Sequence, residues 1–205
     1  MKDNFERCLA HVLASEGGWA DDKADPGGAT MKGITIGTYR AWKGRAVTKA
    51  ELRAISDAEV AAIYRQNYWN AVRGDDLPPG LDLVAFDGAV NSGVSRGARW
   101  LQQALGVTAD GKVGPQTLTA ARQAHPEAVI DRACDLRMGF LRGLPTWSRF
   151  GKGWSSRVNS VRDTAISMSI NPAGSPKPAP THDPDMTPVM VIAAVAVAIL
   201  VYLTM

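Results

Sequence analysis

The sequence predicts a mainly helical α+β domain with one short hairpin, followed by a C-terminal transmembrane helix. Three observations indicate this fold class. Apolar residues recur at helical spacing through most of residues 1–170, a single short stretch alternates apolar and other residues, and residues 188–205 are almost entirely apolar. A length of 205 residues suits one compact domain with appendages.

The first elements follow from apolar spacing. The opening helix carries one apolar stripe at i, i+4, i+7 and i+8, formed by Phe5, Leu9, Val12 and Leu13. We expect His11 on the polar flank of this helix. The short hairpin is predicted at Thr30–Gly37, where Ile34 and Ile36 alternate with other residues.

Caps and helix breakers mark the later helices. Two capping-box patterns, Thr48-x-x-Glu51 and Ser56-x-x-Glu59, each open a helix. Gly106 ends a helix that starts at Arg96, and Pro115 opens the next one in its first turn. Two further helices are predicted at residues 127–141 and 154–168.

Composition then divides the chain into four segments. Residues 1–92 and 93–170 form the two halves of the folded part. Residues 171–187 are rich in proline and read as a semi-rigid linker. Residues 188–205 would extend over about 27 Å as a helix, against a bilayer core of about 30 Å, which predicts a single membrane span. A terminal core helix is the alternative for this last segment.

Charge and cysteine content restrict the function classes. The net charge of +3 suits an acidic polymer such as a bacterial cell wall or a nucleic acid, but no basic run of the kind found in nucleic-acid-binding arms is present. We therefore expect no nucleic acid as partner. Cys8 and Cys134 fall on apolar helix faces outside any Cys/His cluster, so we expect two buried thiols and no metal or cofactor.

Glu16 is the strongest candidate for chemistry. It continues the apolar stripe of the first helix, and Gly17-Gly18 then end that helix with little bulk beside the carboxyl group. Burial without a cationic partner favours the protonated form of a carboxylic acid, which a general acid for glycosidic oxygen requires. The alternative is a solvated glutamate at a frayed helix end.

The loop at residues 24–30 supplies further candidates. Its glycines and proline form a tight turn that would deliver Asp25 and Thr30 toward Glu16. Two carboxylates and a hydroxyl suit glycoside hydrolysis, in which one acid protonates the leaving oxygen and a second group orients water or stabilises the oxocarbenium-like transition state. A turn with no chemical role is the alternative.

These motifs resemble glycoside hydrolase family 108, whose members are N-acetylmuramidases, over about residues 5–165. The resemblance is carried by Glu16-Gly17-Gly18-Trp19, Asp25-Pro26-Gly27-Gly28-Ala29-Thr30, Gly33-Ile34-Thr35, Tyr64-Arg65-Gln66-Asn67-Tyr68-Trp69, Phe86-Asp87-Gly88-Ala89-Val90-Asn91-Ser92-Gly93 and Asp110-Gly111-Lys112-Val113-Gly114-Pro115-Gln116-Thr117-Leu118.

The resemblance implies a lysozyme-like helical domain that cleaves the β-1,4 bond between N-acetylmuramic acid and N-acetylglucosamine, in host-cell lysis or wall remodelling. It implies that Glu16 is the catalytic acid. The spacing of Glu16, Asp25 and Thr30 is also similar to the glutamate–aspartate–threonine triad of phage-type lysozymes, although the Asp-to-Thr interval is one residue shorter, and Thr35 is the substitute for Thr30. The family resemblance also implies a muramidase half at residues 1–92 and a predicted peptidoglycan-binding half at residues 93–170. A lytic transglycosylase and a non-catalytic wall-binding or secretion-accessory protein are the competing functions.

Several further residues are candidates for substrate binding. Asp87 and Asn91 lie one helical turn apart and share a face. Tyr39 and Trp69 could stack on sugar rings, although large aromatic residues more often belong to the core. With Thr35, these residues complete the expected site. The apolar tail adds a location, a host inner membrane, and with it a holin-type lysis partner.

Overall fold

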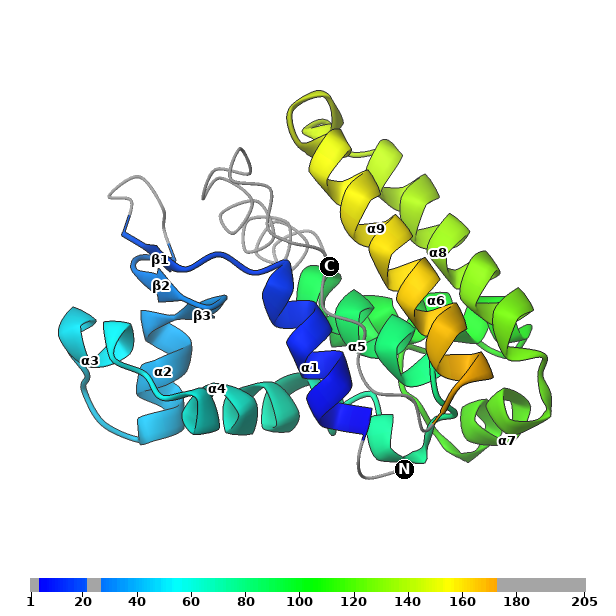
Figure 1. The fold of residues 1–205 in the computed structure, drawn as a ribbon, viewed down its shortest axis with the longest axis horizontal. Helices are drawn as coiled ribbons and strands as arrows, with labels where there is room; N and C mark the ends of the chain where they lie inside the picture. The colour runs from blue at the N-terminus through cyan, green and yellow to red at the C-terminus, as the bar shows by residue number, and fades with distance from the viewer. Residues whose placement is uncertain (1–3, 22–26, 173–205) are drawn as a thin grey trace.

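The computed structural model describes residues 4–21 and 27–172, which are mostly helical (Figure 1). The elements in chain order are α1 (Asn4–Ala14), β1 (Trp19–Ala20), β2 (Thr30–Met31), β3 (Ile34–Thr35), α2 (Ile36–Lys43), α3 (Lys49–Arg53), α4 (Asp57–Tyr64), the π-helix η1 (Arg65–Trp69), the 3-10 helix η2 (Gly74–Asp76), α5 (Leu81–Ser92), α6 (Val94–Leu105), α7 (Pro115–Gln123), α8 (Pro126–Arg142) and α9 (Trp147–Ile170).

The helix α5 is the centre of the fold. It contacts α1, α6, α8 and α9, and 11 of its 12 residues are buried. A helix that is apolar on nearly all sides is stable only when other elements surround it. In Figure 1 the sheet with α2 and α3 lies on one side of α1, and the long antiparallel pair α8 and α9 lies on the other.

The three short strands form one antiparallel sheet in the order β1-β2-β3. Thr30 pairs with Thr35 across the β2–β3 hairpin. Lys32 and Gly33 make the turn, with φ angles of 49° and 75°. Positive φ at both central residues is the geometry of a type I′ turn, whose twist suits a two-residue hairpin. The expected hairpin therefore forms over residues 30–35, whereas Ile36 and Gly37, which were expected to belong to it, begin α2.

The expected caps are also present. The side chains and backbones of Thr48 and Glu51, and of Ser56 and Glu59, make both hydrogen bonds of a capping box at the starts of α3 and α4. Gly106 ends α6 in a left-handed conformation.

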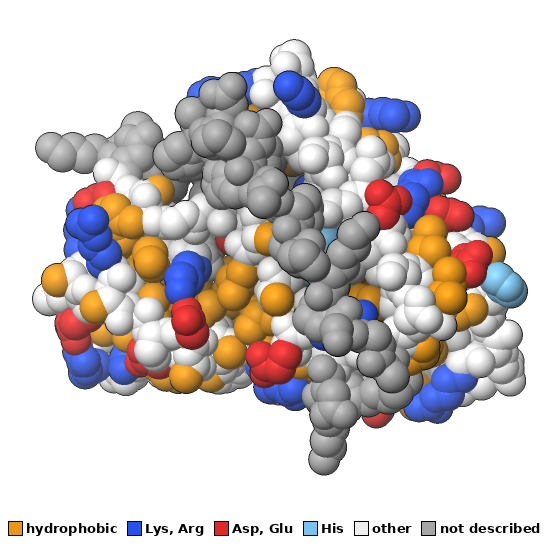
Figure 2. Space-filling model, in the orientation of Figure 1, with side chains coloured by type: hydrophobic (Ala, Val, Ile, Leu, Met, Phe, Trp, Pro, Cys, Tyr) orange, Lys and Arg blue, Asp and Glu red, His pale blue; other side chains and the backbone are white. Residues whose placement is uncertain are grey.

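Both Cys8 and Cys134 are free, buried thiols. Basic and acidic side chains alternate around the edge of the face drawn in Figure 2, so the small net charge is spread out there.

The transmembrane part of the expected fold class is corrected. Within residues 4–21 and 27–172, no helix is both long and apolar enough to cross a bilayer. The predicted span at residues 188–205 lies outside the described residues, as does most of the linker at 171–187. The structure thus supplies a mainly helical fold without a membrane-spanning helix in its described part. The expected inner-membrane location is likewise corrected, because none of the described helices could cross a bilayer, and the holin-type partner inferred from that location has no support.

Candidate active site

Glu16 lies just beyond the end of α1, where two backbone hydrogen bonds continue the helical turn. The N–H groups of Ser15 and Glu16 donate to the carbonyls of Val12 and Leu13. This keeps Glu16 in the register of the buried stripe, and its side chain is only 6% exposed. The sheltered position expected from the apolar spacing is therefore present.

The structure differs from the expectation in giving Glu16 a cationic partner. Nη1 of Arg157, on α9, donates to Oε1 of Glu16 at 2.9 Å. The two residues are 141 positions apart, so local sequence around Glu16 carries no sign of this contact. The interaction is nearly dry, because the Arg157 side chain is 5% exposed.

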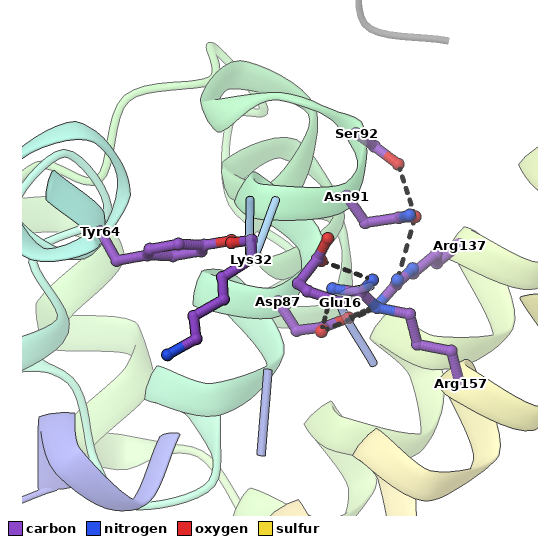
Figure 3. A network of polar contacts seen from close by, with 8 residues as sticks. All are labelled: Glu16, Lys32, Tyr64, Asp87, Asn91, Ser92, Arg137 and Arg157. Atoms are coloured by element: carbon purple, nitrogen blue, oxygen red, sulfur yellow. Dashed lines mark hydrogen bonds and ion pairs between the residues drawn. The ribbon is translucent and has the colours of Figure 1, made fainter. Parts of the chain in front are cut away.

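Asp87 holds the rest of the Arg157 guanidinium. Nε of Arg157 donates to Oδ2 of Asp87 at 3.0 Å and Nη2 donates to the same oxygen at 2.8 Å. Arg137, on α8, adds a donor to Oδ1 of Asp87 at 2.6 Å and another to Oδ1 of Asn91 at 3.0 Å. Figure 3 shows this network on one side of Glu16, with Tyr64 and Lys32 on the other.

The network has clear electrostatic consequences. Burial raises the pKa of Asp87, but the charges of Arg157 and Arg137 outweigh burial and hold that pKa below its ordinary value. Burial likewise lowers the pKa of Arg157, and the carboxylates of Asp87 and Glu16 outweigh it, so the pKa of Arg157 is raised. The negative charges of Glu16 and Asp87 and the positive charges of Arg137 and Arg157 therefore balance one another in a low-dielectric setting.

The hairpin turn lies against the other side of Glu16. The Tyr64 hydroxyl donates to the carbonyl of Lys32 at 2.9 Å. A Cβ atom on Gly33 would lie 2.9 Å from Oε2 of Glu16. Burial and the charge of Glu16 both raise the pKa values of Tyr64 and Tyr68. Glu16 is thus bordered by α9 at Oε1 and by the hairpin at Oε2.

The expected threonines and Tyr39 serve other contacts. Thr30 is buried in β2. Oγ1 of Thr35 accepts from the N–H of Thr38 at 3.1 Å and caps α2. Tyr39 is buried and its hydroxyl donates to Oε1 of Glu59 at 3.2 Å, so its ring has no open face for a sugar. Asp25 lies outside the described residues.

Trp69 is corrected from a sugar-stacking candidate to a core residue. Its exposure is 0%, and its ring packs edge-on against Phe5 and Phe86 at centroid distances of 5.4 and 5.3 Å. Its Nε1 donates to Oδ1 of Asp75 at 3.0 Å. A ring enclosed on both faces cannot stack on a ligand, because stacking requires an accessible face.

The shared face of Asp87 and Asn91 exists, but it points to arginines rather than to open space. Both side chains are buried and both accept from Arg137. They lie behind Glu16 and are hydrogen-bonded to Arg137, so we expect neither side chain to contact a glycan directly. His11, expected on a polar flank, is also buried, at 7% exposure, and its Nε2 has no hydrogen-bond partner.

The arginines are the residues that sequence reasoning missed, although a signal was present. On α9 the buried stripe includes Trp154, Val158 and Val161, and Arg157 falls within it. On α8 the residue at the same kind of position is Arg137, between Ala133 and Leu141. A charged residue within an apolar stripe, on each of several helices, predicts a buried ionic network. The same rule had singled out Glu16.

The described part of the chain contains no group of three or more His, Cys, Asp or Glu side chains that could hold a metal ion.

Two family models match consecutive parts of the chain. The family model for glycosyl hydrolase 108 matches residues 9–93, and that for a predicted peptidoglycan domain matches residues 96–159. The comparison with curated proteins gives no match.

Solved structures supply a close relative. The structure of SagA from Brucella abortus is 46% identical in sequence, with a TM-score of 0.76. The similarity covers 85% of this chain and 100% of that one. Similarity of this extent is decisive for family membership. With the sheltered Glu16 and the two family matches, it identifies the chain as a member of the glycosyl hydrolase 108 family, a glycoside hydrolase that acts on peptidoglycan.

Proposed function

We propose that the protein is a muramidase that cleaves the β-1,4 bond between N-acetylmuramic acid and N-acetylglucosamine, with Glu16 as the general acid. The observation that carries this proposal is the setting of Glu16: a carboxyl group with 6% exposure, at a helix end, followed by two glycines. A general acid must be sheltered enough to keep a proton and must be approachable by the glycosidic oxygen.

The two carboxyl oxygens have different neighbours, which suits this role. Oε1 accepts from Arg157, whereas Oε2 faces the bare backbone of Gly33. In the acid form, Oε1 would remain an acceptor and Oε2 would carry the proton for the leaving oxygen. Asp25 remains our candidate for the second carboxylate, which would orient water or stabilise the oxocarbenium-like transition state.

The test is Glu16→Gln in the full chain, assayed by clearing of a suspension of peptidoglycan. Glutamine keeps the size of the side chain but has no proton to give, so we expect activity to fall by about 10²–10⁴-fold with the fold unchanged. Glu6→Gln is the matched control, because Glu6 lies on the same helix and is exposed. Full activity of Glu16→Gln would overturn the proposal.

Mass spectrometry of the products decides between hydrolysis and the competing transglycosylase reaction. Hydrolysis adds water across the bond and leaves reducing muramic acid ends. A transglycosylase closes the sugar on itself and leaves 1,6-anhydro ends. We expect reducing ends, because the family model that matches residues 9–93 is that of a glycosyl hydrolase.

A further inference from the structure

We propose that the buried Arg157–Asp87 ion pair orients Glu16, so that Arg157 is a positioning residue supplied by the C-terminal helix pair. This inference rests on the proposed function, because it requires Glu16 to be the acid. Neither arginine nor Asp87 touches the glycan in this scheme. They act through Glu16.

The first argument is geometric. Arg157 contacts Glu16 through Nη1 alone, while its Nε and Nη2 are both engaged by Asp87. A planar guanidinium held along one edge by a carboxylate has a fixed direction at its remaining donor. That donor keeps Oε1 as an acceptor, and the proton of the acid form therefore belongs on Oε2, on the side of the hairpin turn.

The second argument is electrostatic. A lone arginine at 5% exposure would be a poorly compensated charge in a low-dielectric setting. Asp87 offsets that effect, because three of the four hydrogen bonds donated by Arg157 go to its carboxylate. Glu16 thus experiences an ion pair rather than an isolated cation. Arg137 in turn balances Asp87 from α8.

Among the described residues, the other groups around Glu16 add no competing charge at neutral pH. Burial raises the pKa values of Tyr64, on α4, and Tyr68, on η1, so both stay neutral. Burial lowers the pKa of His11, on α1, and so it stays neutral too. Lys32, in the hairpin turn, has its ammonium group paired with Asp57. Within residues 4–21 and 27–172, the Arg157–Asp87 pair is therefore the charged neighbour that can orient Glu16.

The pair also connects the two regions matched by family models. Glu16 and Asp87 lie within residues 9–93, whereas Arg157 and Arg137 lie within residues 96–159. Without the second region, Asp87 would be a carboxylate in an apolar setting with no cation, and Glu16 would lose its donor. The predicted peptidoglycan domain is thus inferred to complete the catalytic centre, in addition to any part in binding the wall.

Four variants of the full chain test the inference: Arg157→Met, Arg157→Lys, Asp87→Asn and the control Arg162→Met. Arg162 lies on the same helix and forms ion pairs with Asp131 and Asp135, away from Glu16. Each variant is checked for its fold by circular dichroism. The release of reducing ends from purified peptidoglycan is then measured from pH 4 to pH 9 as kcat and KM.

The expected effects fall on kcat. Arg157→Met removes the donor that orients Oε1 of Glu16, so kcat should fall by about 100-fold with KM little changed. Asp87→Asn weakens the hold on one edge of the guanidinium and should also lower kcat. Arg157→Lys keeps the charge but lacks the planar fork that fixes the direction of its donors, so kcat should fall for this variant too.

Several results would overturn the inference. These are a kcat of Arg157→Met equal to that of Arg162→Met, a fall in activity of Arg157→Met that appears in KM rather than in kcat, or wild-type kcat for Arg157→Lys. The lysine variant decides the matter if the two others fail to fold. An inactive Glu16→Gln combined with any of these results rejects the inference alone, whereas an active Glu16→Gln rejects the proposed function.

Discussion

Gly33 lies directly against the carboxyl group of Glu16, because a Cβ atom at Gly33 would come within 2.9 Å of Oε2. The same Cβ atom would also collide with the Tyr64 hydroxyl. Gly33 has a φ angle of +75°, which side-chain-bearing residues rarely adopt. The hairpin can therefore reach both Glu16 and Tyr64 only because residue 33 has no side chain.

The first prediction concerns Gly33→Ala. The added methyl group must displace either the Glu16 carboxyl group or the turn, and a displacement of about 1 Å at a catalytic group lowers activity by about 100-fold. The positive φ adds about 1–2 kcal/mol of destabilisation. Rates of peptidoglycan clearing and urea unfolding of the same samples measure the two effects.

Gly44→Ala is the control for Gly33→Ala, because Gly44 has a φ angle of +64° and nothing within 4 Å of its Cβ position. It should lose a similar amount of stability and keep its activity. Equal activity of the two alanine variants would show that Gly33 does not border a working carboxyl group.

Tyr64→Phe should loosen the hairpin turn. The hydroxyl of Tyr64 is buried and donates to the Lys32 carbonyl at 2.9 Å, so its removal should lower the free energy of unfolding by about 1 kcal/mol. Clearing activity should fall as well, since the turn borders Glu16. Tyr68→Phe leaves the Lys32 contact in place and serves as the comparison. A Tyr64→Phe protein as stable and active as Tyr68→Phe would count against this role.

Trp69→Phe should affect stability and not substrate binding. The indole is fully buried, and its loss deprives Asp75 of the donor at 3.0 Å, at an expected cost of about 1 kcal/mol or more. KM for peptidoglycan should equal that of the unmodified protein, because the ring has no face open to a sugar. A raised KM with unchanged stability would restore Trp69 to the substrate site.

Asp82 should make stability depend on pH. Burial raises the pKa of Asp82 from 3.8 to about 6, against the lowering effect of hydrogen bonds from Asn4, Leu83 and Gly80. Between these two values the folded protein binds more protons than the unfolded chain, so this group's contribution to stability falls as pH rises from about 4 to about 6. The full difference corresponds to about 3 kcal/mol.

Asp82→Asn removes that dependence. The free energy of unfolding of this variant should equal that of the wild type near pH 4 and exceed it above pH 6. Urea titrations at pH 4, 5, 6 and 7.5 measure the difference. The Asn4 amide can reverse to accept from the new amide group. A constant difference between the two proteins across this range would contradict the raised pKa of Asp82.

Much of the fold was predictable because its signals are local. The capping boxes at Thr48 and Ser56 need only residues three positions apart, and both form. The hairpin at Thr30–Thr35 depends on alternation and on a turn that accepts positive φ. The sheltered side chain of Glu16 follows from its place on the stripe of α1.

Other expectations failed where a single helix could not decide. His11 was placed on a polar flank, yet packing of α1 against α5 buries it. Trp69 was a candidate for stacking, and the π-helix η1 turns it into the core beside Phe5 and Phe86. Other helices and strands decide which face of a helix is buried, and these elements are distant in sequence.

The sequence by itself determined the local elements, the apolar stripes and the acid at the end of the first helix, because each depends on residues within a few turns of one another. Only the tertiary structure decided what faces that acid. Arg157 reaches Glu16 because α9 packs on α5 and thereby brings together side chains that are 141 positions apart. Spacing along one helix predicts that a charged residue is buried. The packing of that helix against the others decides which residue is its ion-pair partner.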